Sequence, residues 1–208
     1  MHKVLMDQLF ADIDQGLVRY LSRKGQIADV CLYRKVGSSG NTSEFFDVTC
    51  KEGSMVAFRV ANFREQGNYR YNCLPQSCTT LMIFNCDQLY ELNTRWLPSQ
   101  ATIITLSTNV IYGTIDLTCL PEPLRMFDVS RNVISGPISL THLPPDLEIL
   151  NLGYNKIKQH TVPYKKLPIT IQNINLLENK IRRVRHADGK PGADENRVKM
   201  IFHRNVDV

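Results

Sequence analysis

The stretch LPEPLRMFDVSRNVISGPISLTH, residues 120–142, is followed directly by LPPDLEILNLGYNKI, residues 143–157, which repeats its pattern with most letters changed. The same Leu-Pro pair recurs at a regular interval along the chain. The pairs begin at Leu74, Leu97, Leu120, Leu143 and Leu167, so the intervals are 23, 23, 23 and 24 residues. A fixed period of this length predicts stacked structural repeats, in which each unit contacts only its neighbours.

Each unit carries two apolar residues two positions apart, followed three positions later by asparagine or cysteine. A period of two predicts a short strand with both apolar side chains on one face. The apolar pairs are Leu81/Ile83, Ile104/Leu106, Phe127/Val129, Leu150/Leu152 and Ile174/Leu176, and the residues that follow them are Cys86, Asn109, Asn132, Asn155 and Asn179. We expect the asparagines to form a buried column that satisfies backbone groups where the chain turns off each strand.

These residues resemble leucine-rich repeats, whose pattern is LxxLxLxxN/CxL over 20 to 29 residues. The form LPxxLxxLxLxxNxISGxIxL resembles repeats abundant in protist proteins, kinetoplastid ones among them, and is also similar to the SGxIP repeats of plants. The resemblance covers roughly residues 54–205 and implies an α/β, β-rich solenoid with short parallel strands on a concave face. Prolines in the connections, with glycine turns in YGTIDL and SGPISL, predict an extended or 3₁₀ convex side.

Degenerate units are expected at both ends of the array, because end units cap the core. Upstream, apolar residues one period before the first clear unit occur at Phe58, Val60 and Phe63. Downstream, a weak match occurs at Met200, Phe202 and Asn205. The predicted solenoid therefore spans residues 54–205, with five clear units between degenerate end units.

Residues 1–53 do not repeat and are predicted to form an N-terminal cap, an amphipathic helix followed by one or two strands. A helix of about twenty residues ending near Gly25 is expected. It rests on apolar residues at every fourth position, namely Leu5, Leu9, Ile13, Leu17 and Leu21. Residues 29–36 and 45–50 are the expected strands. The alternative is that the helix docks on a partner.

In a leucine-rich repeat horseshoe, the residues between the apolar strand positions point outward, so stacked units form rows of exposed side chains. Aromatic residues, methionine and arginine are enriched at protein interfaces. The candidate partner-binding residues on the concave face are Arg59, Met82, Phe84, Met126, Asp128, Arg131, Asn151, Tyr154 and Asn175. The alternative is that these side chains merely cover the sheet.

The C-terminal part of the chain is basic. Residues 156–208 hold 12 Lys or Arg against 5 Asp or Glu, a net charge of +7, whereas residues 1–155 hold 13 against 15, a net charge of −2. The run KIRRVRH, residues 180–186, supplies the candidate polyanion contacts Lys180, Arg182, Arg183 and Arg185. Contact with RNA is one interpretation. A solvated basic flank is the other, since no RNA-binding motif or interleaved aromatic residue accompanies the run.

The sequence contains no recognisable catalytic, cofactor or metal motif. The motifs GxSxG, HExxH and CxxC are absent, as is a phosphate-binding loop, so we expect no enzyme activity, no cofactor and no metal. The N-terminal stretch does not resemble a signal peptide, and no apolar run approaches the roughly 20 residues of a membrane span. We therefore expect an intracellular, cytoplasmic protein with its six cysteines reduced.

The sequence thus predicts a non-catalytic protein-protein interaction or scaffolding module that binds a partner of unknown identity through its concave surface. The alternative is a structural subunit of a large ribonucleoprotein or filament assembly, with its basic C-terminal flank contacting RNA or an acidic protein. Binding would depend on the concave side chains in the first case and on the basic run in the second.

Overall fold

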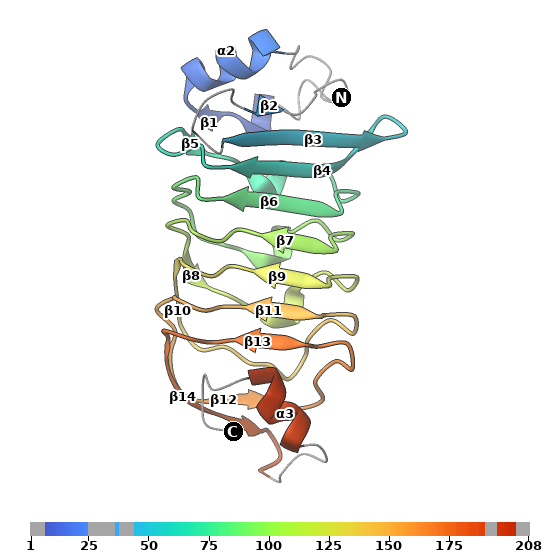
Figure 1. Ribbon diagram of the computed structural model, residues 1–208, viewed down its shortest axis with the longest axis vertical. Coiled ribbons are helices and arrows are strands. Elements are labelled where there is room, and N and C mark those ends of the chain that lie inside the picture. Colours follow the sequence, from blue (N-terminus) through green and yellow to red (C-terminus); the bar gives the residue numbers. More distant parts are fainter. Residues whose placement is uncertain (1–6, 25–35, 38–43, 190–194, 203–208) are drawn as a thin grey trace.

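The computed structural model describes residues 7–24, 36–37, 44–189 and 195–202. These residues form a solenoid of stacked coils of about 23 residues, with strands stacked along one side (Figure 1). The main sheet has the strand order β13-β11-β9-β7-β6-β4-β3-β2. In chain order its strands are β2 (Val36–Gly37), β3 (Phe45–Lys51), β4 (Ser54–Ala61), β6 (Thr80–Phe84), β7 (Ile103–Thr105), β9 (Met126–Asp128), β11 (Ile149–Asn151) and β13 (Asn173–Asn175).

The repeat spacing of the sequence appears in the structure as the register between strands. Leu81 pairs with Ile104 and Ile104 with Phe127. Leu150 then lies between Phe127 and Ile174. All five side chains are fully buried. Because one coil cannot bury its own apolar strand face, the core is built by stacking and runs continuously along the solenoid.

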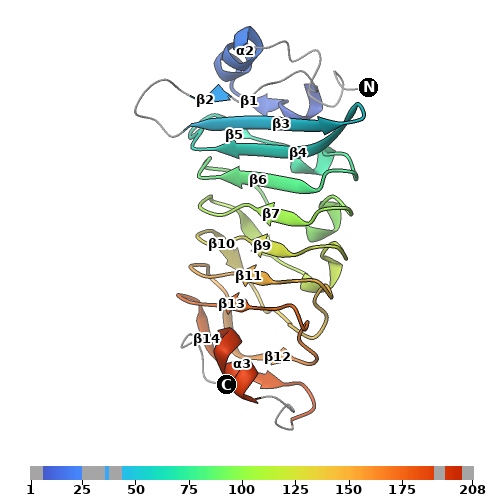
Figure 2. The same cartoon turned by 45° about the vertical axis from the view of Figure 1, so that its right-hand side comes forward.

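The side of the coils opposite the sheet is made of short elements (Figure 2). Each of the 3₁₀ helices η2 (Tyr71–Cys73), η3 (Thr94–Trp96) and η4 (Leu117–Cys119) is followed by the leucine of a Leu-Pro pair. That leucine is extended in each case, because the residue before proline avoids helical backbone angles. Small parallel sheets pair β8 (Tyr112–Thr114) with β10 (Val133–Ser135) and β12 (Lys158–Tyr164) with β14 (Lys180–His186).

The asparagine column closes the turn after each strand. The Nδ2 atom of Asn132 donates hydrogen bonds of 3.0 to 3.1 Å to the carbonyls of Leu106, Val129 and Ser130. Its Oδ1 atom accepts from the amide of Ile111 at 3.0 Å. Since Leu106 and Ile111 belong to the preceding coil, one side chain ties two coils together. Equivalent contacts are made by Asn109, Asn155 and Asn179.

The first clear coil satisfies its turn with a different pair of residues. Cys86 occupies the asparagine position, and its thiol donates to the carbonyl of Phe84. Gln88, where later coils have isoleucine, is fully buried. Its side-chain amide donates to the carbonyls of Gly67 and Cys86 at 2.8 and 2.9 Å and accepts from the amide of Tyr69 at 2.7 Å. The buried amide has thus moved two residues along the turn.

The prediction of a single helix of about twenty residues near the N-terminus is wrong. Helix α2 covers only Gln15–Lys24. The Oδ1 atom of Asp14 accepts hydrogen bonds from the amides of Gly16 and Leu17, at 2.8 and 3.1 Å. Aspartate in this position caps a helix and begins it, so the four-residue period that crosses Asp14 in the sequence belongs to separate elements.

The residues before α2 pack onto the first coil. Strand β1 (Asp12–Ile13) pairs antiparallel with β5 (Gly67–Asn68). The Arg70 guanidinium donates to both carboxylate oxygens of Asp12, at 2.6 and 2.8 Å. The ring of Phe10 lies 5.5 to 6.4 Å, between centroids, from the rings of Phe46, Phe58 and Tyr69. These contacts fix the segment to the end of the solenoid.

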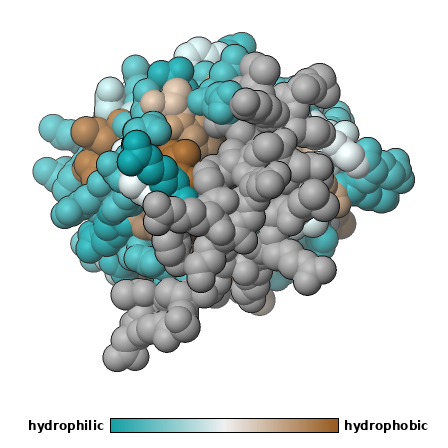
Figure 3. Space-filling view, turned by 90° about the horizontal axis from the view of Figure 1, so that it is seen from above, coloured by the Kyte–Doolittle hydropathy of each residue, from teal (hydrophilic) through white to brown (hydrophobic). Residues whose placement is uncertain are grey.

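The sheet continues across the boundary between residues 53 and 54. Strands β3 and β4 form an antiparallel hairpin, which turns through Glu52 and Gly53, both with positive φ. Residues 45–50, one of the two expected strands, lie within β3, whereas residues 29–35 of the other lie outside the described residues. Viewed from the N-terminal end of the solenoid, the described surface is mostly hydrophilic, with apolar residues gathered to one side (Figure 3).

The degenerate unit predicted at Met200, Phe202 and Asn205 is also wrong. Residues Glu195–Phe202 form helix α3, which packs against β13. Met200 is exposed, and the buried side chains follow helical spacing, at Val198, Ile201 and Phe202. Met200 and Phe202 thus fit a strand period only by coincidence. The residues that face the core, Val198, Ile201 and Phe202, follow the i, i+3, i+4 spacing of a helix. Asn205 lies outside the described residues.

Candidate functional site

The outward side chains of the parallel strands form straight rows, here called the strand face. The central row follows the strand register and consists of Arg59, Met82, Thr105, Asp128, Asn151 and Asn175. Each of these residues is half-buried, and its two neighbours along the chain are buried core residues. The structure therefore places five of the candidate residues in a single row.

A second row lies where the chain turns off each strand. Its members are Asn62, Asn85, Thr108, Arg131, Tyr154 and Glu178, and all have positive φ, between 52° and 64°. This left-handed conformation is strained for most residues other than glycine and asparagine. The stacking holds it in place, since turn amides bond to the next coil, as Thr108 does to the Ser130 carbonyl at 3.0 Å. The Arg131 guanidinium lies 4.3 Å above the centre of the Tyr154 ring, which adds a cation–π contact between neighbouring coils.

Four apolar or aromatic side chains on the strand face are each more than a third exposed. Phe84 and Ile103 are each 37% exposed, Leu177 is 38% exposed and Tyr154 is 41% exposed. The candidates Met82 and Met126 are half-buried on the same face, where Met126 pairs with Ile103 in the strand register. Ile103 and Leu177 were not among the candidates from the sequence. Each is directly next to a core residue along the chain, and this position could have indicated an outward-facing side chain.

Several polar candidates already have structural partners. Asp128, Asn151 and Asn175 each accept a hydrogen bond through the side-chain Oδ1 atom. The donor is the backbone amide two residues later, at 2.9 to 3.2 Å. Such turns end the strands. Arg59 pairs with Asp47 at 2.7 Å. These four residues contribute to the strand ends and the first hairpin, whatever else they contact.

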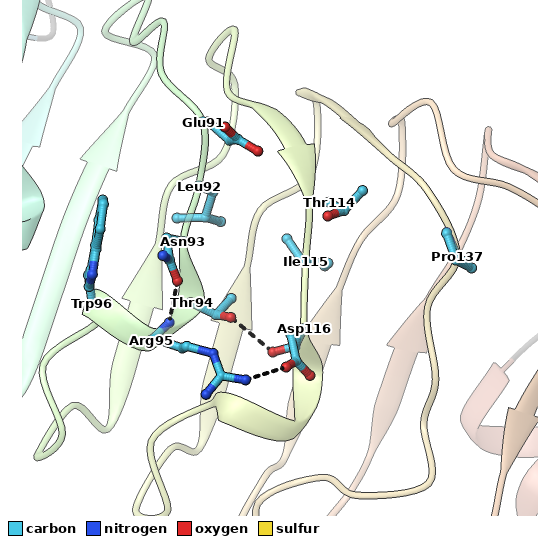
Figure 4. Close-up of a pocket in the computed structure, with 10 residues that line it drawn as sticks. All are labelled: Glu91, Leu92, Asn93, Thr94, Arg95, Trp96, Thr114, Ile115, Asp116 and Pro137. Atoms are coloured by element: carbon cyan, nitrogen blue, oxygen red, sulfur yellow. Dashed lines mark hydrogen bonds and ion pairs between the residues drawn. The ribbon is translucent and has the colours of Figure 1, made fainter.

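A cavity of about 610 Å³ lies beside η3 and η4 (Figure 4). The Thr94 hydroxyl donates to the Asp116 carbonyl at 3.0 Å, and Asn93 Oδ1 accepts from the Arg95 amide at 3.0 Å. Arg95 also lies 3.4 Å from the Asp116 carboxylate. These bonds cap the 3₁₀ helices and join adjacent coils, so four polar residues of the lining have structural roles, namely Asn93, Thr94, Arg95 and Asp116. The segment YELNTRW, residues 90–96, replaces the glycine turn of the following units, and this change in sequence was the available signal for a different surface here.

Asp116 is the most perturbed acidic group of this region. Hydrogen bonds from the Thr118 hydroxyl, the Cys119 thiol and the Thr118 amide lower its pKa to about 2, and Arg95 adds a smaller electrostatic contribution. All of these partners stabilise the carboxylate, and Asp116 caps η4. A carboxylate with a lowered pKa is a poor proton donor or acceptor near neutral pH, which is consistent with a structural role.

The four candidate polyanion contacts lie together on β14. Lys180, Arg182, Arg183 and Arg185 are all exposed. Strand β12 lies alongside in parallel register, with Lys158 next to Lys180. The Nε atom of Arg183 donates to the hydroxyl of Thr161 on β12 at 3.0 Å. The structure therefore gathers the basic run on one small sheet, apart from the strand face.

Two buried cysteines, Cys78 and Cys86, have thiols of low expected reactivity. Burial raises the pKa of Cys78 to about 11 and that of Cys86 to about 12, which keeps both protonated. The free cysteines of the described residues are Cys73, Cys78, Cys86 and Cys119. Cys50 is disulfide-bonded, so the expectation that all six cysteines are reduced is wrong for this residue.

The described residues contain neither a candidate metal site nor a candidate membrane-spanning helix. No group of three or more His, Cys, Asp or Glu side chains in this part of the chain is placed to hold a metal ion. No helix within the described ranges is both long and apolar enough to cross a membrane. The chain matches no family model, and a search of curated proteins finds no match either.

Proposed function

We propose that the chain is a leucine-rich repeat protein whose strand face binds a protein partner without catalysis. The family assignment is supported by the 23-residue period, the stacked asparagines and the parallel sheet. Leucine-rich repeats are one of the few architectures that combine these features. The 3₁₀ and extended elements behind the sheet fit the type with short convex segments.

One observation carries the binding proposal, namely the exposed apolar side chains on the rows of the strand face. Phe84, Ile103, Tyr154 and Leu177 are each more than a third exposed. They project from a backbone held by strand pairing, so binding would order little additional chain. Aromatic and aliphatic anchors on a rigid surface are the usual energetic centre of a protein interface.

The two ends of the solenoid are proposed to be caps. At the N-terminal end, β1, α2 and β3 cover the first coil around the Phe10 ring cluster. At the C-terminal end, α3 covers β13, and the Arg197 guanidinium donates to the Pro168 carbonyl at 2.6 Å. Capping elements are a general requirement of repeat arrays, because an open coil would expose the core.

The test compares partner capture by the wild-type chain and by a variant with Phe84→Ala and Tyr154→Ala. The control is Trp96→Ala, which removes a 53% exposed aromatic residue from η3, away from the strand face. We expect affinity purification with quantitative mass spectrometry to show partners lost only with the strand-face variant. A partner set unaffected by that variant, or lost equally with the control, would contradict the proposal.

A further inference from the structure

Among the described residues, strand β14 is an edge strand, with one side paired to β12 and the other side unpaired. It pairs with β12 alone, and no other described strand pairs with it. Helix α3 packs against β13 of the main sheet. Strand β14 is seven residues long and contains no proline, so its outer edge offers a row of backbone donors and acceptors.

The same strand carries cations that form no ion pair with any acidic side chain of the described ranges. Among the described residues, none of Lys180, Arg182, Arg183 and Arg185 forms an ion pair. The exposed lysines of the neighbouring segment, Lys156, Lys158, Lys165 and Lys166, have none either. Earlier coils differ, because acidic side chains there pair with Arg59, Arg64, Arg70, Arg95 and Arg125. The positive charge around β14 is therefore uncompensated within the described chain.

We propose that β14 binds an acidic, extended segment of a partner protein as an added strand. Charges on an edge strand keep neutral strands and other copies of the chain away, because pairing would bury or oppose the cations. With an acidic strand, the same cations would attract the partner, because each would lie near a negative charge. Its backbone would complete the open ladder, and its alternate side chains, about 6.6 Å apart along a strand, would face the arginines and lysines.

An acidic protein segment fits better than a nucleic acid. Single-stranded nucleic acids are usually held by exposed aromatic side chains that stack on bases. The one Phe, Tyr or Trp of β12 and β14 is Tyr164, which is buried and packs edge-on against His186. A phosphate backbone would use the charges of β14, whereas an acidic strand would use both the charges and the open edge.

The probe for this surface is a fluorescein-labelled peptide of alternating glutamate and valine, followed by fluorescence polarisation with the full chain. We expect binding to weaken at least about tenfold in the Arg182→Ala, Arg183→Ala, Arg185→Ala variant, since three charge contacts are lost together. The matched control removes the same charge at sites of similar exposure, with Arg64→Ala, Arg95→Ala and Arg125→Ala. The control should change affinity by less than about twofold, because distant charges are screened.

A second peptide separates strand pairing from simple charge attraction. It has the same sequence with alternate backbone amides N-methylated, which keeps the charge and blocks the ladder, and we expect its binding to weaken by at least tenfold as well. Equal binding of both peptides would overturn the proposal, and so would tighter binding of an RNA duplex of equal charge. Self-association of the protein that disappears in the β14 variant, measured by sedimentation, would assign the edge to a second copy instead. Circular dichroism of each variant confirms that the fold is retained.

Discussion

The Oδ1 atom of Asn132 accepts a hydrogen bond of 3.0 Å from the backbone amide of Ile111, which lies in the preceding coil. The same contact recurs one unit later, where Asn155 accepts from Ile134 at 3.0 Å. Each asparagine therefore replaces the ladder partners that the chain loses as it turns off the sheet. The stability of every turn depends on the coil that follows it.

Replacing Asn132 by alanine is expected to lower the free energy of unfolding by about 3 to 5 kcal/mol, because several buried backbone groups lose their partner at once. Urea denaturation followed by circular dichroism measures the change. Asn132→Cys should fall between alanine and the wild type, since the thiol of Cys86 makes the equivalent bond to the Phe84 carbonyl. Equal losses for alanine and cysteine would show that this bond is unimportant.

Gln88 should be as sensitive as an asparagine of the column. Gln88→Leu keeps the volume and removes the bonds to Gly67, Tyr69 and Cys86, so we expect a loss of about 2 to 4 kcal/mol. The control is Gln159→Leu, whose side chain makes similar backbone bonds at a half-buried position and should cost about 1 kcal/mol. Thermal unfolding of both variants provides the comparison, and a larger loss for Gln159 would refute the assignment.

Thr108 occupies the left-handed row with a φ of 58° and is β-branched, which makes it one of the most strained members. Asparagine tolerates this conformation and is already present in the row at Asn62 and Asn85. Thr108→Asn should therefore raise the free energy of unfolding by about 0.5 to 1 kcal/mol. The reverse change, Asn85→Thr, should destabilise the protein. Chemical denaturation of both variants tests whether the free energy of unfolding rises in the first and falls in the second.

Asp116 should make stability depend on pH in the acid range. Its pKa is lowered to about 2 in the folded protein, from an ordinary value of 3.8 for an aspartate side chain. The stabilisation is present above about pH 4 and is lost as the pH falls toward 2, because the unfolded chain takes up the proton first. Comparing the unfolding of Asp116→Asn and the wild type from pH 7 to pH 2 should show the two curves converging at low pH. Parallel curves would exclude this role.

Phe10 should hold the N-terminal segment on the first coil. Phe10→Ala removes a buried ring that contacts three others, and we expect a loss of about 3 to 4 kcal/mol. Native-state hydrogen exchange locates the effect. Faster exchange confined to residues 7–24 and β3 would support a separable cap, whereas a uniform loss would mean that the segment unfolds together with the solenoid.

Local pattern matching failed where two periods overlapped or where one residue interrupted a run. The spacing of Ile13 and Leu17 fits one helix. However, Asp14 between them caps the beginning of α2, and Ile13 belongs to the separate strand β1. Met200 and Phe202 fit the strand period, yet α3 buries Phe202 and exposes Met200. In both cases the apolar spacing alone allowed two solutions, and packing on the solenoid ends selected one.

The sequence by itself determined the solenoid, its period and its strand register, because units that repeat the same apolar pattern about every 23 residues can bury their apolar pairs only by stacking in line. It also determined which residues form the rows of the strand face. Only the tertiary structure decided which of those side chains remain available. Asp128, Asn151 and Asn175 bond to their own turns, Arg59 bonds to Asp47, and the cations of β14 keep no acidic partner among the described residues. Exposure and pairing depend on neighbours in space, which a repeat pattern does not specify.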